Sequence, residues 1–249
     1  MKIIVIAAGS GKRLGKKTEN IPKYLLDVNG KTILEHQLEV FKKTNFKKFV
    51  IITGPYKEKF VAKKFTYVED VDYHKHDILG SLMVAREHIK GDVLIVYSDI
   101  IFDDSIIKQM VETQADIAIA VDLEWKKSYE GRTEHTNAEA ENVLLDKSFN
   151  VLEIRKNIPS NQDKIVGEFL GILKLSKNGS SIFVKKFDEL KKSHKSDFYM
   201  AQSLEKAYLT DMIQELIDSK IKVTPVVVSG KWCEIDTMQD LKRAAKMFQ

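Results

Sequence analysis

The chain has 249 residues, a hydrophobic content of 43% and a formal net charge of +4, from 40 basic and 36 acidic side chains. This nearly balanced charge argues against nucleic acid as a partner. No stretch approaches the ~20 apolar residues of a membrane span, and the N-terminal apolar run lacks the features of a signal peptide. The single cysteine, Cys233, excludes an internal disulfide and suits a small buried position. We expect one soluble, cytoplasmic domain over residues 1–249.

Strand and helix patterns alternate through the first half of the chain. Short apolar runs predict buried strands at residues 3–6, 49–53, 65–68, 93–97 and 117–121. Helical spacing predicts helices at residues 33–41, 57–64, from 78 onward, and at 106–111. This alternation indicates βαβ units and a mostly parallel sheet, and hence an α/β fold.

The pattern changes after residue 121. Residues 124–142 are polar and have no clean period. Strands are predicted at residues 143–145, 151–154, 169–173, 222–228 and 232–235, and helices at 182–190, 208–220 and 237–248. We therefore expect a small β-rich insertion at about residues 122–165 within the same domain.

The segment after the first strand has the composition of a phosphate-binding loop. Small residues expose backbone N–H groups there, and cations follow them: Ala7, Ala8, Gly9, Ser10, Gly11, then Lys12, Arg13 and, after Pro22, Lys23. The loop lacks the third glycine of G-x-G-x-x-G and is too short for G-x-x-x-x-G-K-[ST]. Composition alone leaves a structural turn and a phosphate loop equally open.

The ordered motif A-A-G-S-G-K-R-L-G, then P-K-Y-L-L-D-V-N-G, resembles the signature of nucleotidyltransferases that activate sugar phosphates and polar alcohol phosphates. That signature runs L-x-A-G-x-G-x-R-L, then P-K-x-L and a glycine, and Ile6 replaces its leading leucine. The resemblance implies a Rossmann-like, GT-A-like three-layer sandwich. It also implies transfer of a nucleotidyl group from a nucleoside triphosphate to a phosphorylated acceptor, with release of pyrophosphate. Residues 1–121 would bind the nucleotide and residues 122–249 the acceptor, with the insertion at 122–165 as a lid.

The resemblance assigns roles to four charged residues. Asp99, which follows the fourth strand as Ser98-Asp99 where the family usually has G-D, and Asp236, in W-x-E-I-D-T-x-x-D-L, would hold Mg²⁺. On residue type alone, each aspartate could equally be a turn former or a helix cap. Arg13 would bind the β/γ-phosphates, and Lys23 the α-phosphate or the acceptor phosphate. For Lys12, a contact with phosphate and a solvated position are both open. We expect Asp240 to belong to the last helix.

Three segments are expected to surround the base and ribose. They are the first loop, the turn at Thr53 and Gly54, and the segment with Asp77, Gly80 and Ser81. The last segment resembles the N-x-x-S-L form of the cytidylyltransferases for phosphocholine and 2-aminoethylphosphonate. An ordinary helix start is the alternative for Gly80 and Ser81.

The acceptor site is the least defined part. Glu168 lies in a segment matching the family strand that faces the acceptor, where it would meet a hydroxyl or an ammonium group. Trp125, Tyr129 and Trp232 could offer aromatic faces to a cation, although packing is the favoured alternative. The other conspicuous side chains, His74, His76 and His135, are expected to have surface or hydrogen-bonding roles and to form no metal cluster.

Together these features predict a Mg²⁺-dependent cytidylyltransferase. It would transfer CMP from CTP to a small phosphate or phosphonate, of the 2-aminoethylphosphonate or phosphocholine type. One alternative is a sugar-1-phosphate or inositol-1-phosphate nucleotidyltransferase. Another is a non-catalytic nucleotide-binding subunit, which predicts loss of the four charged residues, all of which are present. The oligomeric state, including a homodimer, is left open.

Overall fold

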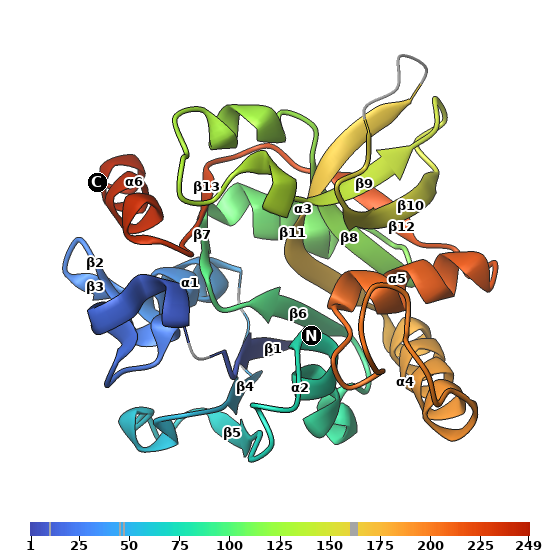
Figure 1. Ribbon diagram of the computed structural model, residues 1–249, viewed down its shortest axis with the longest axis horizontal. Coiled ribbons are helices and arrows are strands. Elements are labelled where there is room, and N and C mark those ends of the chain that lie inside the picture. Colours follow the sequence, from blue (N-terminus) through green and yellow to red (C-terminus); the bar gives the residue numbers. More distant parts are fainter. Residues whose placement is uncertain (10, 45, 47, 160–163) are drawn as a thin grey trace.

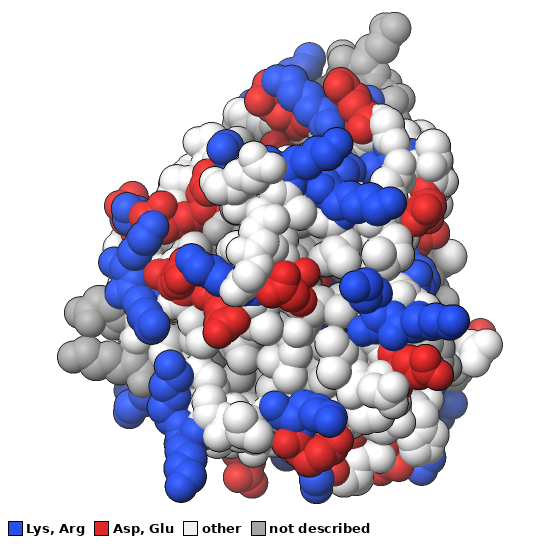
Figure 2. All heavy atoms as spheres, turned by 90° about the vertical axis from the view of Figure 1, so that its left-hand side faces the viewer, with Lys and Arg blue, Asp and Glu red and all other residues white. Residues whose placement is uncertain are grey.

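The computed structural model describes residues 1–9, 11–44, 46, 48–159 and 164–249. Ser10, expected to bind nucleotide, lies outside these residues, and so does the side chain of Lys12. Among the described residues, no helix combines the length and apolar character needed to cross a bilayer. Basic and acidic side chains are interspersed on the face drawn in Figure 2, as the balanced composition predicts.

A large central sheet forms the middle of the molecule (Figure 1). Strand β1 (Lys2–Ala7) lies between β6 (Val93–Tyr97) and β4 (Lys48–Thr53) and is parallel to both, and β5 (Thr66–Glu69) extends this part beyond β4. The predicted α/β class, with a large and mostly parallel central sheet, is confirmed. The carboxyl ends of β1 and β6 consequently lie side by side at one edge of the sheet.

The second half of the sheet is built around one long strand. This strand, β11 (Ile165–Leu175), is antiparallel to β6, β8 (Ile117–Asp122) and β9 (Glu141–Leu145). Two further strands complete this half: β10 (Val151–Lys156) beside β9, and β12 (Thr224–Val227) beside β8. The two strands of the expected insertion therefore continue the central sheet, and the residues before them form 3₁₀ turns at Trp125–Tyr129 and Asn137–Glu139.

Helices cover both faces of the sheet. Along β1, Ile3 and Val5 pack into one hydrophobic cluster, and Ile4 and Ile6 pack into the other. Burial of each such side chain contributes about 1.5–3 kcal/mol. The first cluster is covered by α1 (Ile33–Lys43), α3 (Asp104–Glu112) and α6 (Met238–Met247), and the second by α2 (Ile78–Val84), α4 (Lys177–Ser193) and α5 (Leu209–Asp218). This gives the three layers that the sequence predicts.

Small elements complete the chain. Antiparallel pairs form between β2 (Asp27–Val28) and β3 (Lys31–Thr32), and between β7 (Ile100–Phe102) and β13 (Trp232–Glu234). Further 3₁₀ turns lie at Lys12–Thr18, Lys23–Leu25, Lys57–Lys59 and Arg86–His88. The helix predicted at residues 57–64 is wrong: only the turn at Lys57–Lys59 forms, and none of its residues is buried. Phe60 is buried but follows the turn in an extended conformation, so residues 57–64 present no helical apolar stripe that would stabilise a longer helix.

Candidate active site

Two adjoining cavities lie where β1 and β6 end. The larger, which we name the loop cavity, measures about 1050 Å³ and is lined by the glycine loop after β1 and by Tyr97 to Asp99 after β6. The smaller, which we name the acidic cavity, measures about 380 Å³. Arg13, Asp77, Asp99 and Asp236 line both cavities. Residues far apart in the sequence thus meet on a shared boundary.

Four charged side chains meet at this boundary. Lys23 Nζ lies 3.0 Å from Asp99 Oδ2 and 2.5 Å from Asp236 Oδ1. Arg13 reaches the other oxygen of Asp236, with an N–O distance of 2.8 Å. The residues singled out as phosphate-binding cations and metal ligands therefore form one ion-paired cluster.

The two aspartates are brought together by pairing of β7 with β13. Asp99 immediately precedes β7, and Ile100 pairs with Glu234 two residues before Asp236. The amide of Ile235 also donates to the carbonyl of Asp99 at 2.8 Å. Because this antiparallel pair joins the middle of the chain to its end, sequence spacing alone could not predict the distance.

A buried glutamine that the sequence analysis missed supports this turn. Gln37, on α1, is 1% exposed, and its Nε2 donates to the carbonyls of Tyr97 and Ile100, on either side of Asp99. Tyr24, next to Lys23, donates its hydroxyl to Gln37 Oε1 at 2.8 Å. A glutamine within the apolar stripe of α1 was the available signal, because buried polar groups need partners.

The electrostatics of the cluster favour the ionised pair. Burial by itself would lower the pKa of Lys23, but the carboxylates of Asp99 and Asp236 raise it above its usual value. Burial opposes ionisation of Asp236 too, yet Lys23, His135 and Arg13 hold its pKa well below the usual range. Both groups are therefore charged at neutral pH, and the site holds paired carboxylates at the edge of a cavity. Oxygen donors of this kind suit a hard divalent cation.

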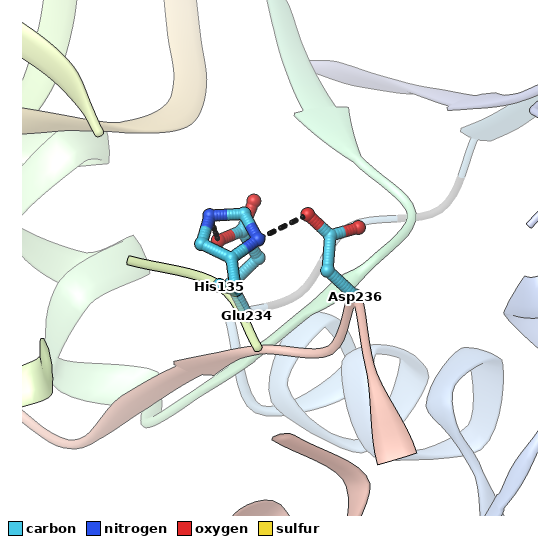
Figure 3. Close-up of side chains that lie close together, drawn as sticks. All are labelled: His135, Glu234 and Asp236. Carbon is cyan, nitrogen blue, oxygen red and sulfur yellow. Dashed lines mark ion pairs between the residues drawn. The ribbon is translucent and has the colours of Figure 1, made fainter. Parts of the chain in front are cut away.

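His135 lies between two carboxylates of this site (Figure 3). Its Nδ1 is 3.0 Å from Asp236 Oδ2, and its Nε2 is 3.4 Å from Glu234 Oε2. The sequence predicted no metal cluster of His74, His76 and His135. The structure brings His135 together with Glu234 and Asp236, and the donor atoms of these three side chains lie close enough to hold a metal ion. No sequence signal was available, because both partners lie about 100 residues further along the chain.

The glycine loop lines the loop cavity. Ala7, Ala8, Gly9 and Gly11 all contribute to its wall. Gly11 has a φ of 62°, and a Cβ there would lie 3.2 Å from Lys23 Cβ, so the turn brings the loop against the segment carrying Lys23. This close approach explains the glycine.

The turn at Thr53 and Gly54 supports the loop instead of lining the cavity. Thr53 is 1% exposed, and a Cβ on Gly54 would lie 2.3 Å from the carbonyl oxygen of Ala8. Neither residue lines the loop cavity. Both residues therefore pack behind the loop, and their contact with the nucleotide stays a prediction.

The residues at the start of α2 also fall into two groups: some line the loop cavity and one does not. Asp77 and Ser81 line the loop cavity. Gly80 does not: a Cβ there would lie 2.3 Å from the carbonyl oxygen of Glu205. Gly80 therefore allows α2 to pack closely against its neighbours, and its role in binding the nucleotide stays a prediction. His74 and His76, expected to have surface or hydrogen-bonding roles, line the loop cavity too.

Carboxyl groups dominate the acidic cavity. Glu141, Glu168 and Glu234 line it together with the aspartates, and carboxyl groups outnumber Lys and Arg. Burial raises the pKa of Glu168 well above its usual value. Burial and neighbouring carboxylates raise the pKa of Glu141 to about 8 and that of Glu234 to about 7. Carboxyl groups whose pKa is raised by burial are typical of ligand-binding sites.

Of the three aromatic residues considered for the acceptor, one lines this cavity. Trp232 does so, and its Nε1 donates to Asp122. Trp125 is 5% exposed and packs against Tyr129, and neither lines the acidic cavity. This agrees with packing, the alternative favoured for both residues from the sequence, and their contact with the acceptor stays a prediction. Tyr129 also donates its hydroxyl to Glu168 Oε1 at 2.5 Å.

Comparison with known proteins places this site in a family. The model of the MobA-like NTP transferase domain matches residues 3–142, more than half of the chain. The CTP:phosphoglutamine cytidylyltransferase of Campylobacter jejuni is 25% identical over 97% of this chain and 98% of its own length. The bifunctional protein GlmU of Methanococcus aeolicus is also 25% identical, but the chain spans about half of it, 53%.

A solved structure shares the fold. The CTP:phosphocholine cytidylyltransferase LicC of Streptococcus pneumoniae has a TM-score of 0.70 and 21% identity, with 100% of this chain and 99% of that chain covered. The family match and the cluster at the sheet edge lead to one conclusion. The chain belongs to the family of MobA-like NTP transferase domains and is a nucleotidyltransferase.

Proposed function

We propose that this protein is a Mg²⁺-dependent cytidylyltransferase that transfers CMP from CTP to a small phosphate or phosphonate acceptor and releases pyrophosphate. The observation that carries the proposal is the cluster of Arg13, Lys23, Asp99 and Asp236 between the two cavities. The nucleotide would occupy the loop cavity and the acceptor the acidic cavity. CTP as donor is supported by the cytidylyltransferase relative that matches nearly the whole chain.

The main requirement of the reaction is neutralisation of the negative charge on the triphosphate and the acceptor phosphate. An oxygen of the acceptor phosphate attacks the α-phosphorus, and the bond from that phosphorus to the bridging oxygen of pyrophosphate breaks. Lys23, buried beside both aspartates, would neutralise the charge at the α-phosphorus, and the more exposed Arg13 would bind the leaving pyrophosphate. Mg²⁺ held by Asp99 and Asp236 would supply further positive charge to the phosphates.

The acidic cavity favours an acceptor that carries a positive charge away from its phosphate. Because burial raises the pKa of Glu141 and of Glu168, both carboxyl groups favour the uncharged form without a ligand. An ammonium group would stabilise their ionised form and pair with it, which a neutral sugar would not do. Tyr97 and Trp232 line the same cavity and offer aromatic surface to such a cation. Phosphocholine and 2-aminoethylphosphonate both carry a cationic group away from the phosphate or phosphonate. A phosphorylated glutamine does so too, through its amino group.

A pyrophosphate-release screen tests this function. CTP, UTP, GTP, ATP and dTTP are each combined with phosphocholine, 2-aminoethylphosphonate, phosphoglutamine, inositol 1-phosphate and glucose 1-phosphate, in the presence of Mg²⁺. We expect turnover with CTP and a cationic acceptor. Preference for another triphosphate, or for the two neutral acceptors, would contradict the proposal in its donor or acceptor part respectively. Absence of turnover with every pair would favour a non-catalytic nucleotide-binding subunit.

Two variants test the metal site within the same assay. Asp99→Asn and Asp236→Asn each remove a negative charge and keep the side-chain shape. We expect turnover to fall by at least about 100-fold in each, as in other losses of a group that stabilises transition-state charge. Asp103→Asn, in the loop after β7, is the control and should retain wild-type turnover. Wild-type rates in the first two variants would exclude the two-aspartate site.

A further inference from the structure

A buried carboxylate outside the catalytic cluster organises one wall of the loop cavity. Asp70 follows β5, its side chain is fully buried, and it does not line the cavity. Ser81 donates its hydroxyl proton to Asp70 Oδ2 at 2.7 Å, and His76 Nδ1 lies 2.9 and 3.0 Å from the two carboxylate oxygens. Both Ser81 and His76 do line the cavity.

The carboxylate decides which way these two groups present their protons. An ionised carboxylate only accepts hydrogen bonds, so its partners must donate to it. In the neutral imidazole, a proton on Nδ1 leaves Nε2 as an acceptor. The hydroxyl of Ser81 has one proton, which it donates to Asp70. Both groups are therefore left with lone pairs for a ligand in the cavity.

The backbone keeps this arrangement in place. The amide of Asp70 donates to the carbonyl of Thr53 at 2.8 Å, which ties the carboxylate to the end of β4. A Cβ on Gly80 would lie 3.0 Å from His76 Cβ and Cδ2, so the glycine lets the imidazole pack against α2. Side-chain positions held this firmly can discriminate between ligands that differ by one polar group.

We propose that Asp70 is a positioning residue for base recognition: it forces His76 and Ser81 to act as acceptors, and this selects the amino group of cytosine over the carbonyl of uracil. The two pyrimidines differ at this edge, where cytosine donates from its 4-amino group and uracil presents an oxygen. The carbonyl oxygen of uracil would face the lone pairs of His76 and Ser81. It would find no hydrogen-bond donor there to replace the water that it loses on binding. The inference rests on the proposed function, because it places the base at this wall of the loop cavity.

Binding of CTP and UTP in the presence of Mg²⁺ and without an acceptor tests the inference. Dissociation constants are measured by calorimetry at about pH 8, above the range in which histidine ordinarily takes up a proton. We expect wild-type protein to bind CTP at least about tenfold more tightly than UTP. Asp70→Asn offers an amide donor to the imidazole, which allows the opposite tautomer, so the ratio of the two constants should fall at least about tenfold.

The matched control is Asp72→Asn. Asp72 lies two residues further along, its side chain is 46% exposed and it pairs with Lys75, so the same substitution should leave the ratio unchanged. His76→Gln is the second variant and keeps Asp70 in case the buried substitution impairs folding. A glutamine amide can turn either its oxygen or its NH₂ to the base, so discrimination should fall while binding of both nucleotides is retained.

The outcomes separate this inference from the proposed function. CTP binding with an unchanged CTP-to-UTP ratio in both variants overturns the inference alone, as does tighter wild-type binding of UTP than of CTP. Binding of neither nucleotide overturns the proposed function and the inference with it. A fall in the ratio of the UTP to the CTP dissociation constant supports a positioning role, because a merely structural defect would weaken binding of both nucleotides equally.

Discussion

Lys23 is the residue on which the catalytic cluster depends. Its ammonium group lies between Asp99 and Asp236, and its side chain is only 10% exposed. The Coulomb attraction between a cation and two carboxylates is much stronger when they are buried than on the surface, because water does not screen it. Arg13, whose side chain is 58% exposed, can instead reach a ligand from the rim of the site.

Replacement of Lys23 by alanine should stop catalysis. Lys23→Ala leaves the two aspartates without their shared cation, and we expect turnover to fall by about 10²–10³-fold, with a smaller effect on CTP affinity. Steady-state pyrophosphate release and CTP binding measure the two effects. Lys31→Ala is the control, since Lys31 is exposed and pairs with Glu39. A turnover within twofold of wild type would remove Lys23 from the mechanism.

Glu141 should impose a pH dependence. Burial and nearby carboxylates raise its pKa to about 8 in the folded protein, from 4.5. The folded state then binds a proton that the unfolded chain releases, so stability should fall as the pH rises from about 4.5 to 8. Over the upper part of this range Glu141 ionises, and the KM for a cationic acceptor should fall.

Glu141→Gln removes the titrating group and checks this prediction. Urea unfolding and acceptor KM are measured as a function of pH for the variant, the wild type and the control Glu130→Gln at an exposed position. The variant should show a flatter stability profile, and its KM should lose the decrease seen above about pH 7. Profiles identical to wild type in both measurements would assign the titration to another group.

Among the elements, β11 connects the fold to the acidic cavity. It pairs with β6 and β9 and carries Glu168, and its register against β8 shifts between Phe169 and Leu173. Gly171 lies within this shift and has a φ of 66°. A Cβ on Gly171 would lie 2.3 Å from Tyr97 Cδ2, so the strand leaves room for the ring of Tyr97 at the cavity wall.

Gly171→Ala should therefore destabilise the protein by more than its backbone conformation explains. Gly91→Ala is the matched control: it also has a positive φ, 71°, but a Cβ there meets nothing within 4 Å. The control should cost about 1–2 kcal/mol. Gly171→Ala should exceed it by about 1–3 kcal/mol and raise the acceptor KM as Tyr97 moves. Equal free energies of unfolding would contradict the steric explanation.

At the scale of the whole molecule, the loop cavity draws on both ends of the chain. Its wall includes Ala7 and Gly9 near the start and Asp236 near the end. A ligand bound there contacts both halves of the chain and stabilises the folded state through both. The pairing of β7 with β13 provides the physical link between them.

CTP with Mg²⁺ should consequently stabilise the protein as one unit. At a CTP concentration of about 100 Kd, the free energy of unfolding should rise by about 2.7 kcal/mol. For a chain of this size, the midpoint of thermal unfolding should increase by roughly 5–10 °C. Calorimetry measures the shift, and hydrogen exchange locates it. Protection confined to residues 1–121 would show that the two halves respond separately.

The sequence determined the layers and the identity of the charged residues by itself. Buried strands such as β1 are recognisable because their side chains are apolar on both faces, and amphipathic helices such as α1 because one stripe is apolar. The motif from Ala8 to Lys23 predicted the phosphate-binding side of the site through its ordered resemblance to a family. These signals are local, so no tertiary information was needed.

Only the tertiary structure decided which residues face a ligand. Pairing of β7 with β13 brings Asp236 to Asp99, and folding of residues 124–142 carries His135 to both Glu234 and Asp236. The packing of Gly54 against Ala8 and of Gly80 against Glu205, and the burial of Asp70 as a hydrogen-bond acceptor, have the same origin. Burial and hydrogen-bond direction depend on segments distant in sequence, and local patterns do not encode them.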